Sequence, residues 1–216
     1  DRKKLYVMYD QMYWHLTYGP IEHCDPVSMR PAMKAYTIYI DAISKVFAAT
    51  GVRVGWSMGP AEVISKMKAI LTHIGTWAPM AEQKAVAHYL HQTGSIQSFL
   101  GHFKKEISAR LQGIYGGFMQ LKNEGLPVDA IAPEAAIYLT IKIDAKNRTT
   151  AAGQLLVSQS DVTAYLLDAA QLAVVPFYAF GADRSSPWYR LSVGTCKKEE
   201  IGEMLGKLRE ALRSLQ

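Results

Sequence analysis

The order of apolar and polar residues changes several times along the chain. A continuous apolar and aromatic run over residues 5–9 predicts a buried strand of a parallel sheet. β-branched and aromatic residues predict a second strand over residues 36–40, which ends at Asp41, and a third over residues 52–56. Between the first two strands, three prolines separated by polar residues predict an irregular loop over residues 19–31. The N-terminal part of the chain is therefore expected to carry short strands.

Apolar residues then recur at helical spacing. Two helices are predicted over residues 61–71 and 81–92, each beginning just after a proline. A long helix is predicted from residue 95 to about residue 124, where a glycine and a proline end it. Three glycines between residues 113 and 117 interrupt its apolar stripe and can kink the helix.

The pattern changes again in the C-terminal part. Apolar residues at every second position over residues 137–143 predict a strand with one buried face. A helix is predicted over residues 161–171, short strands over residues 173–175 and 189–193, and a last helix from about residue 197. The whole order predicts an α/β chain with a strand-and-helix unit followed by a small α+β unit. The change of domain is expected inside the long helix, which gives domains of residues 1–104 and 105–216.

Composition narrows the class of protein. The 216 residues are 49% hydrophobic and 20% charged, as in ordinary globular domains. No apolar run approaches the ~20 residues that span a bilayer, so no membrane partner is expected. The net charge of +5 comes from scattered basic residues, apart from the short clusters Arg2, Lys3, Lys4 and Lys104, Lys105. This favours a solvated surface or anionic ligands over nucleic acid.

The two cysteines, Cys24 and Cys196, are too few for a disulfide framework or a zinc finger. A reducing, cytoplasmic setting is therefore expected. The six histidines show no metal-binding spacing with carboxylates, so no metal site is predicted. The chain starts in charged residues directly before a strand, with no Met and no apolar signal segment, which is the pattern expected of a fragment.

The most informative stretch follows the second strand. Lys45 comes directly after Ser44 and is flanked by small residues, and Arg53 follows eight residues later between Gly51 and Gly55. Covalent catalysis by an amine needs a closely fitted lysine, and a phosphate needs a nearby guanidinium. The spacing alone leaves open a surface lysine and a structural arginine. It resembles the cofactor signature of class I and II aminotransferases, pyridoxal-phosphate (PLP) enzymes of the aspartate aminotransferase type.

Two further stretches fit the same family. The first strand ends in Asp10, with Tyr13 three residues on, and Arg190 lies in the strand near the C-terminus. The resemblance implies that Asp10 pairs with the pyridine nitrogen of PLP, that Tyr13 bonds its phenolic oxygen, and that Arg190 grips the substrate α-carboxylate. It also implies Lys45 as the catalytic lysine and Ser44 and Arg53 as phosphate ligands. Without it, Asp10 would be a turn residue and Arg190 would pair with a carboxylate of its own chain.

The resemblance covers the whole chain and implies fold type I. The chain would be the latter half of the large PLP-binding domain plus the small C-terminal domain, joined by the long helix. The implied activity is amino-group transfer between an amino acid, with aspartate favoured, and a 2-keto acid in amino-acid biosynthesis, by a homodimer. A PLP-dependent lyase, decarboxylase or synthase is also possible, because these enzymes share the same residues. An inactive fragment or basic binding domain is a further alternative.

Some features depart from the family pattern. Ala42 stands where a Ser or Gly usually precedes the lysine, and Phe177 follows Pro176 where a glycine is usual. The family's phosphate-binding glycine turn, its ring-stacking aromatic residue and its asparagine at the phenolic oxygen have no candidate here. We therefore expect this chain alone to bind PLP weakly and to show no useful turnover.

Overall fold

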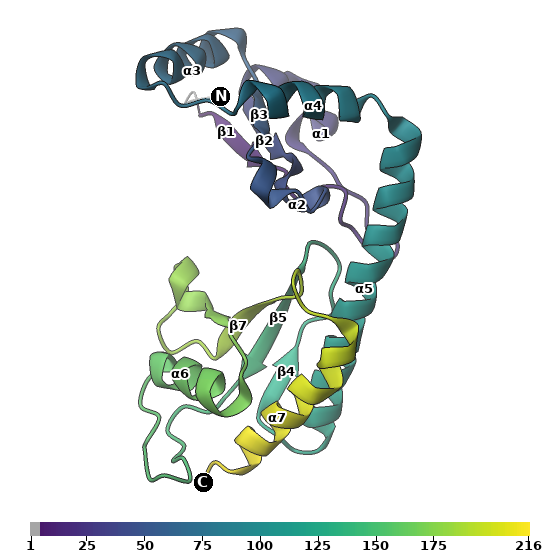
Figure 1. The fold of residues 1–216 in the computed structure, drawn as a ribbon. Helices are drawn as coiled ribbons and strands as arrows, with labels where there is room; N and C mark the ends of the chain where they lie inside the picture. Colours follow the sequence, from purple (N-terminus) through teal and green to yellow (C-terminus); the bar gives the residue numbers. More distant parts are fainter. Residues whose placement is uncertain (1–4) are drawn as a thin grey trace. The chain divides into compact units, whose positions relative to one another are not determined.

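The computed structural model describes residues 5–216 and is an α/β fold (Figure 1). The basic cluster of Arg2, Lys3 and Lys4 lies outside the described residues. The chain divides into two compact units, the first ending at Phe103 and the second starting at Lys104, both within one long helix. Among residues 5–216, no helix combines the length and the apolar character needed to cross a bilayer.

The first unit contains a three-stranded sheet of order β1-β2-β3, formed by β1 (Val7–Asp10), β2 (Thr37–Ala42) and β3 (Gly55–Met58). β1 and β2 are parallel, with Asp10 opposite Ile40. β3 is antiparallel to β2, with Gly55 opposite Ala42. The third strand begins three residues later than its apolar run predicts, because Thr50–Val52 form a 3₁₀ turn, η2.

The first unit also contains short helices and several longer ones. The loop predicted as irregular contains the one-turn helix α1 (Pro26–Met29), and the 3₁₀ helix η1 (Pro31–Ala35) begins at its last residue. Asp25 caps α1 by accepting from two backbone N–H groups, which stabilises a turn that periodicity alone misses. The other helices are α2 (Ile43–Val46), α3 (Ala61–Ile74), α4 (Met80–Leu90) and α5 (Thr93–Asn123).

The core of the first unit lies around α2. Ile43, Val54 and Val86 are buried together, and Phe47 packs against them. The Phe47 ring meets Tyr89 edge-on, with 5.7 Å between ring centroids, and stacks at 6.2 Å on Phe99. These aromatic contacts fix the short helix that carries Lys45.

The second unit contains an antiparallel sheet of order β4-β5-β7-β6. Its strands are β4 (Val128–Ala130), β5 (Tyr138–Ile143), β6 (Val175–Pro176) and β7 (Trp188–Ser192). The predicted alternation in β5 is confirmed, because its odd-numbered residues are fully buried and its even-numbered residues are only partly buried. The helices are α6 (Gln159–Ala170) and α7 (Ile201–Arg213), with the 3₁₀ turns η3 (Phe177–Phe180) and η4 (Lys198–Glu200).

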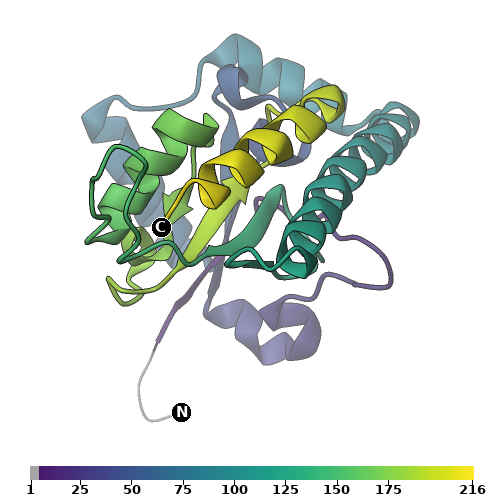
Figure 2. The same ribbon diagram turned by 90° about the horizontal axis from the view of Figure 1, so that it is seen from below.

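The C-terminal half of α5 packs beside α7 (Figure 2). α5 is continuous through Gly113, Gly116 and Gly117, and two of these three glycines lie at the helix contact. A Cβ added at Gly113 would touch Ile201, and one added at Gly117 would overlap Leu205. The glycines therefore allow the two helices to approach closely.

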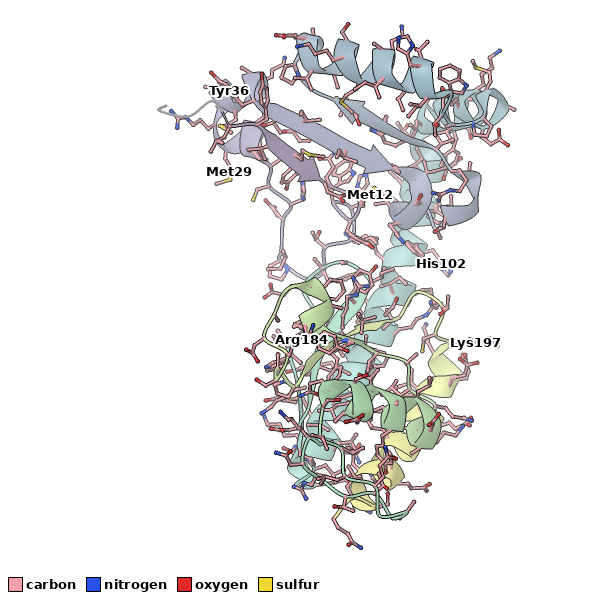
Figure 3. The ribbon with its side chains drawn as sticks, turned by 90° about the vertical axis from the view of Figure 1, so that its left-hand side faces the viewer. Met12, Met29, Tyr36, His102, Arg184 and Lys197 are labelled. Carbon is pink, nitrogen blue, oxygen red and sulfur yellow. The ribbon has the colours of Figure 1, made fainter. Side chains whose placement is uncertain are left out.

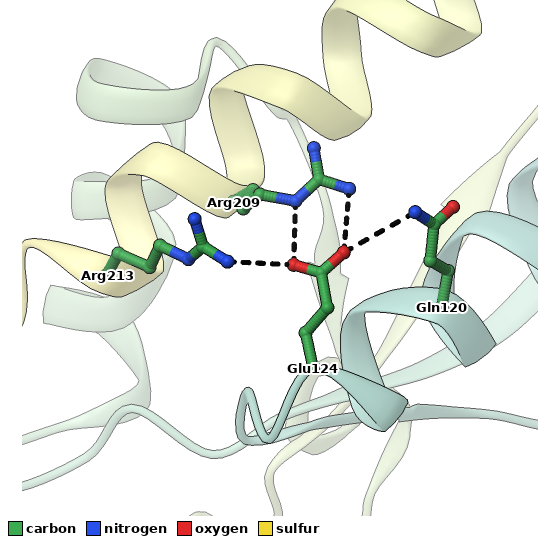
Figure 4. A network of polar contacts seen from close by, with 4 residues as sticks. All are labelled: Gln120, Glu124, Arg209 and Arg213. Atoms are coloured by element: carbon green, nitrogen blue, oxygen red, sulfur yellow. Dashed lines mark hydrogen bonds and ion pairs between the residues drawn. The ribbon is translucent and has the colours of Figure 1, made fainter.

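A polar network joins the same two helices at their ends (Figure 4). Glu124 accepts two hydrogen bonds from the Arg209 guanidinium, at 2.9 and 3.0 Å, and one from Arg213 at 3.1 Å. The bond from Arg209 holds the pKa of the Glu124 carboxyl below its usual range. This bidentate pair fixes the register of α7 on α5.

Candidate active site

The candidate site lies at the carboxyl end of the parallel strand pair. Asp10 is the last residue of β1, and Lys45 lies on α2, which begins directly after β2 ends at Ala42. Because β1 and β2 run in the same direction, both residues lie at the same edge of the sheet. In open α/β sheets, ligands bind outside the carboxyl ends of the strands.

Lys45 is half-buried on a helix of only one turn. The backbone leaves this turn at once, because Ala48 takes a left-handed conformation with φ of 51°. None of the ion pairs among residues 5–216 involves Lys45, so its amine is not committed to a carboxylate there.

The loop after Lys45 is held by side chains that face its backbone. Thr50 Oγ1 donates to the Ser44 carbonyl at 3.0 Å, and the Arg53 guanidinium donates to the Thr50 carbonyl at 2.8 Å. Arg53 is exposed and left-handed, with φ of 61°. Such a backbone favours glycine, so an arginine here points to a role for its side chain.

Ser44 and Arg53 line one cavity of about 540 Å³, which also includes Lys68 of α3 and Gly55. Its wall therefore carries a hydroxyl and two cationic side chains, a donor set that suits a phosphate group. Asp41 also lies on this wall, but its oxygens already accept from three donors. The residues present thus fit the phosphate of PLP, whereas Lys45, Asp10 and Tyr13 are not part of this cavity wall.

Asp10 and Tyr13 share a turn that follows β1. Asp10 is exposed, and its Oδ1 accepts from the Met12 N–H at 3.1 Å, which is the contact of an ordinary turn residue. Met12 is labelled at the end of β1 in Figure 3. Tyr13 is half-buried, and its carbonyl accepts from the Leu16 N–H.

Arg190 belongs to the second unit, where it lies on β7. It pairs across the sheet with Thr140 of β5, on the face opposite to the buried residues of β5 and β7. Its guanidinium carbon lies 4.4 Å from the Tyr138 ring centroid and 4.5 Å from that of Phe180. A purely structural arginine would be expected to pair with a carboxylate of its own chain. No ion pair within residues 5–216 involves Arg190.

A hollow of about 340 Å³ adjoins Arg190 and is lined by Phe177, Phe180 and Ala182. Phe177, the departure from the family pattern, is therefore part of this wall and meets the Phe180 ring edge-on. Arg184 is exposed in the loop before β7 (Figure 3).

Asp41 also belongs to the site region, although the sequence pattern marks it only as the end of a strand. The residue is 5% exposed, and its carboxylate accepts from the Gln11 amide, the Trp14 indole and the Ala42 N–H. Burial raises the pKa of its carboxyl. In the sequence, the only sign of such a role is a charged residue at an otherwise apolar strand end.

Within residues 5–216, no group of three or more His, Cys, Asp or Glu side chains could hold a metal ion.

A family model for class I and II aminotransferases matches residues 1–208, and the chain belongs to that family, whose cofactor is PLP. Curated relatives include an aspartate aminotransferase of Rhizobium meliloti, 30% identical over 98% of this chain and 49% of its own length. A probable aspartate/prephenate aminotransferase of Rhizobium leguminosarum bv. phaseoli is 29% identical over 99% of this chain and 49% of its length. The chain thus spans about half the length of these relatives.

Solved structures agree in fold. The crystal structure of the aspartate aminotransferase from Rhizobium meliloti matches with a TM-score of 0.83 at 27% identity, over 98% of this chain and 50% of that one. An aspartate aminotransferase from Thermus thermophilus with maleate matches with a TM-score of 0.79 at 25% identity, over 96% of this chain and 48% of that one. Fold type I is therefore the fold of this chain.

Proposed function

We propose that this chain supplies the reactive lysine, the phosphate ligands and the carboxylate-binding arginine of a PLP-dependent aminotransferase. In this proposal, residues up to Lys104 are the latter half of the PLP-binding domain and residues from 105 are the small domain. When bound, PLP supplies an aldehyde that captures an amine and a ring that accepts an electron pair from the substrate α-carbon.

The side chains of the first unit would each have a stated task. Lys45 holds the cofactor between turnovers and, once free, moves the proton at the substrate α-carbon as a general base. Asp10 keeps a proton on the ring nitrogen, and Tyr13 donates to the phenolic oxygen. Arg53 and Ser44 bind the phosphate. The cavity that Ser44 and Arg53 share supports the last assignment.

Arg190 would bind the substrate α-carboxylate. The flanking rings of Tyr138 and Phe180 restrict its guanidinium and leave its N–H edge for a carboxylate, which a planar guanidinium binds through two parallel bonds. The proposed substrates are an amino acid and a 2-keto acid. Aspartate is favoured because the relatives are named aspartate and aspartate/prephenate aminotransferases. A cytoplasmic homodimer in amino-acid biosynthesis completes the proposal.

The observation that carries the proposal is the pair of parallel strand ends bearing Asp10 and Lys45, next to the cavity of Ser44 and Arg53. The test incubates the protein, in the form its gene encodes, with PLP, aspartate and 2-oxoglutarate. Glutamate and oxaloacetate should form in equal amounts. Loss of amino acid that does not depend on the keto acid would instead indicate a lyase or a decarboxylase. No consumption of any amino acid in a panel would contradict the proposal.

A further inference from the structure

Asp41 connects two segments of the first unit that lie far apart in sequence. Its Oδ2 accepts from Trp14 Nε1 at 3.1 Å and from Gln11 Nε2 at 3.4 Å. Its Oδ1 accepts from the Ala42 N–H at 2.8 Å. Both long-range donors come from the turn after β1, and they stand on either side of Tyr13 in the sequence.

The acceptor stands on the strand that leads to Lys45. Asp41 is the penultimate residue of β2, and α2 with Lys45 begins after one more residue. The backbone adds a bond near this point, from the Gln11 N–H to the Ile40 carbonyl at 3.0 Å. The side chain of Asp41 therefore links the turn that carries Tyr13 to the strand end that carries Lys45.

Burying a carboxylate at this position costs desolvation free energy. The side chain is almost fully buried, and burial raises the pKa of its carboxyl, with a small further increase from the nearby Asp10. A neutral side chain would avoid this desolvation. Only a carboxylate, however, can accept from all three donors without presenting an N–H or O–H of its own.

Building on the function proposed above, we propose that Asp41 is a positioning residue that holds the Tyr13 turn in place relative to Lys45. It acts through the Gln11 amide and the Trp14 indole. This role requires no contact between Asp41 and the reacting atoms. Its loss would displace Tyr13, and the affinity for PLP would fall while the first unit stays folded.

The matched variants change the hydrogen bonds of Asp41 in steps. Asp41→Asn keeps the side-chain shape but turns one acceptor into an amide donor that faces other donors. Adding Gln11→Glu places a carboxylate, which can only accept, opposite that amide. Trp14→Phe removes a single donor from a partly exposed position and keeps the ring, which provides a variant that folds even if Asp41→Asn does not.

Three measurements on the 216-residue chain follow. Hydrogen exchange of the Trp14 indole N–H, assigned in NMR spectra by its loss in Trp14→Phe, reports the bond without PLP. Urea unfolding reports the fold. The PLP concentration for half-maximal borohydride labelling of Lys45 reports the cofactor site. For Asp41→Asn we expect faster indole exchange, an unchanged or higher urea midpoint and a roughly ten-fold higher PLP requirement. The Gln11→Glu/Asp41→Asn double variant should recover most of the labelling, and Trp14→Phe should raise the PLP requirement less than Asp41→Asn does.

The outcomes separate the two proposals. If the unaltered chain labels Lys45 and Asp41→Asn labels it at the same PLP concentration, the positioning role of Asp41 is wrong. It is equally wrong if the double variant fails to recover labelling while its urea midpoint matches that of the unaltered chain. If the unaltered chain itself labels surface lysines rather than Lys45, the PLP site fails, and the positioning role fails with it.

Discussion

The guanidinium carbon of Arg190 lies 4.4 Å from the centre of the Tyr138 ring, diagonally across the β5–β7 pair. Phe180 provides a second ring at 4.5 Å. An arginine held between two rings keeps its N–H edge available for a planar anion. From this geometry we expect substrate binding to depend on Arg190 in the second unit.

Replacing Arg190 with Lys should weaken substrate binding without affecting the cofactor. Loss of a bidentate carboxylate contact should lower the affinity of the PLP-loaded protein for its amino acid roughly ten- to one-hundred-fold. Labelling of Lys45 should be unchanged. Arg184→Lys, in the exposed loop nearby, is the matched control. Equal substrate affinities for the two variants would remove Arg190 from the proposed site.

Two left-handed residues in the loop after Lys45 allow backbone strain to be separated from phosphate binding. Arg53 has φ of 61° and Ala48 has φ of 51°. Replacing either with Gly should relieve strain, with a change in unfolding free energy of up to about 1 kcal/mol in the stabilising direction. Only Arg53→Gly should lose affinity for PLP, roughly ten-fold or more, because it removes the guanidinium.

Equilibrium unfolding in urea and PLP titration measure both quantities on the same samples. If Arg53→Gly and Ala48→Gly bind PLP equally well, Arg53 is a structural residue, as the spacing alone would allow.

The α5–α7 contact predicts opposite effects for neighbouring glycines. A methyl group at Gly117 would overlap Leu205, whereas one at Gly116 meets no atom within 4 Å. Gly117→Ala should destabilise the second unit by about 1–3 kcal/mol through overpacking. Gly116→Ala should stabilise it by about 1 kcal/mol, the helix-propensity difference between the two residues. Thermal or urea unfolding of the two variants checks the sign, and a stable Gly117→Ala would show that α7 is not packed there.

The Glu124 network predicts a pH dependence of stability. Hydrogen bonding to Arg209 lowers the pKa of the Glu124 carboxyl from its ordinary value of 4.5, so the folded state favours the carboxylate. Its contribution is therefore fully present above pH 4.5 and is lost as the pH falls through the lowered pKa. Urea midpoints measured across this range should fall less steeply for Glu124→Gln than for the unaltered chain. Parallel curves would mean that the network does not contribute to stability.

Segments with a clear apolar pattern could be predicted from the sequence, whereas segments that depend on strand pairing or on a side-chain cap could not. α5 and β5 follow their apolar patterns closely, because many residues repeat one period. β4, only three residues long, was not predicted, because it exists through pairing with β5. α1 was missed in a proline-rich stretch, because its capping by Asp25 outweighs the loop composition.

The same division applies to the site. The resemblance to the family indicates Lys45, Arg53 and Asp10, and two of these, Asp10 and Lys45, follow strands that the apolar pattern predicts. The pairing of Asp41 with Trp14 could not be predicted, because it joins residues 27 apart through the tertiary fold. The rings around Arg190 likewise come from β5 and η3, and no local pattern connects them.

The central claim is that Lys45 is the cofactor lysine, and lysine mapping tests it most directly. The chain is incubated with PLP, reduced with borohydride and digested, and modified lysines are located by mass spectrometry, with Lys45→Arg and Lys34→Arg as variants. We predict label concentrated on Lys45, retained in Lys34→Arg and absent from Lys45→Arg. Label spread over surface lysines, or unchanged in Lys45→Arg, would contradict the account.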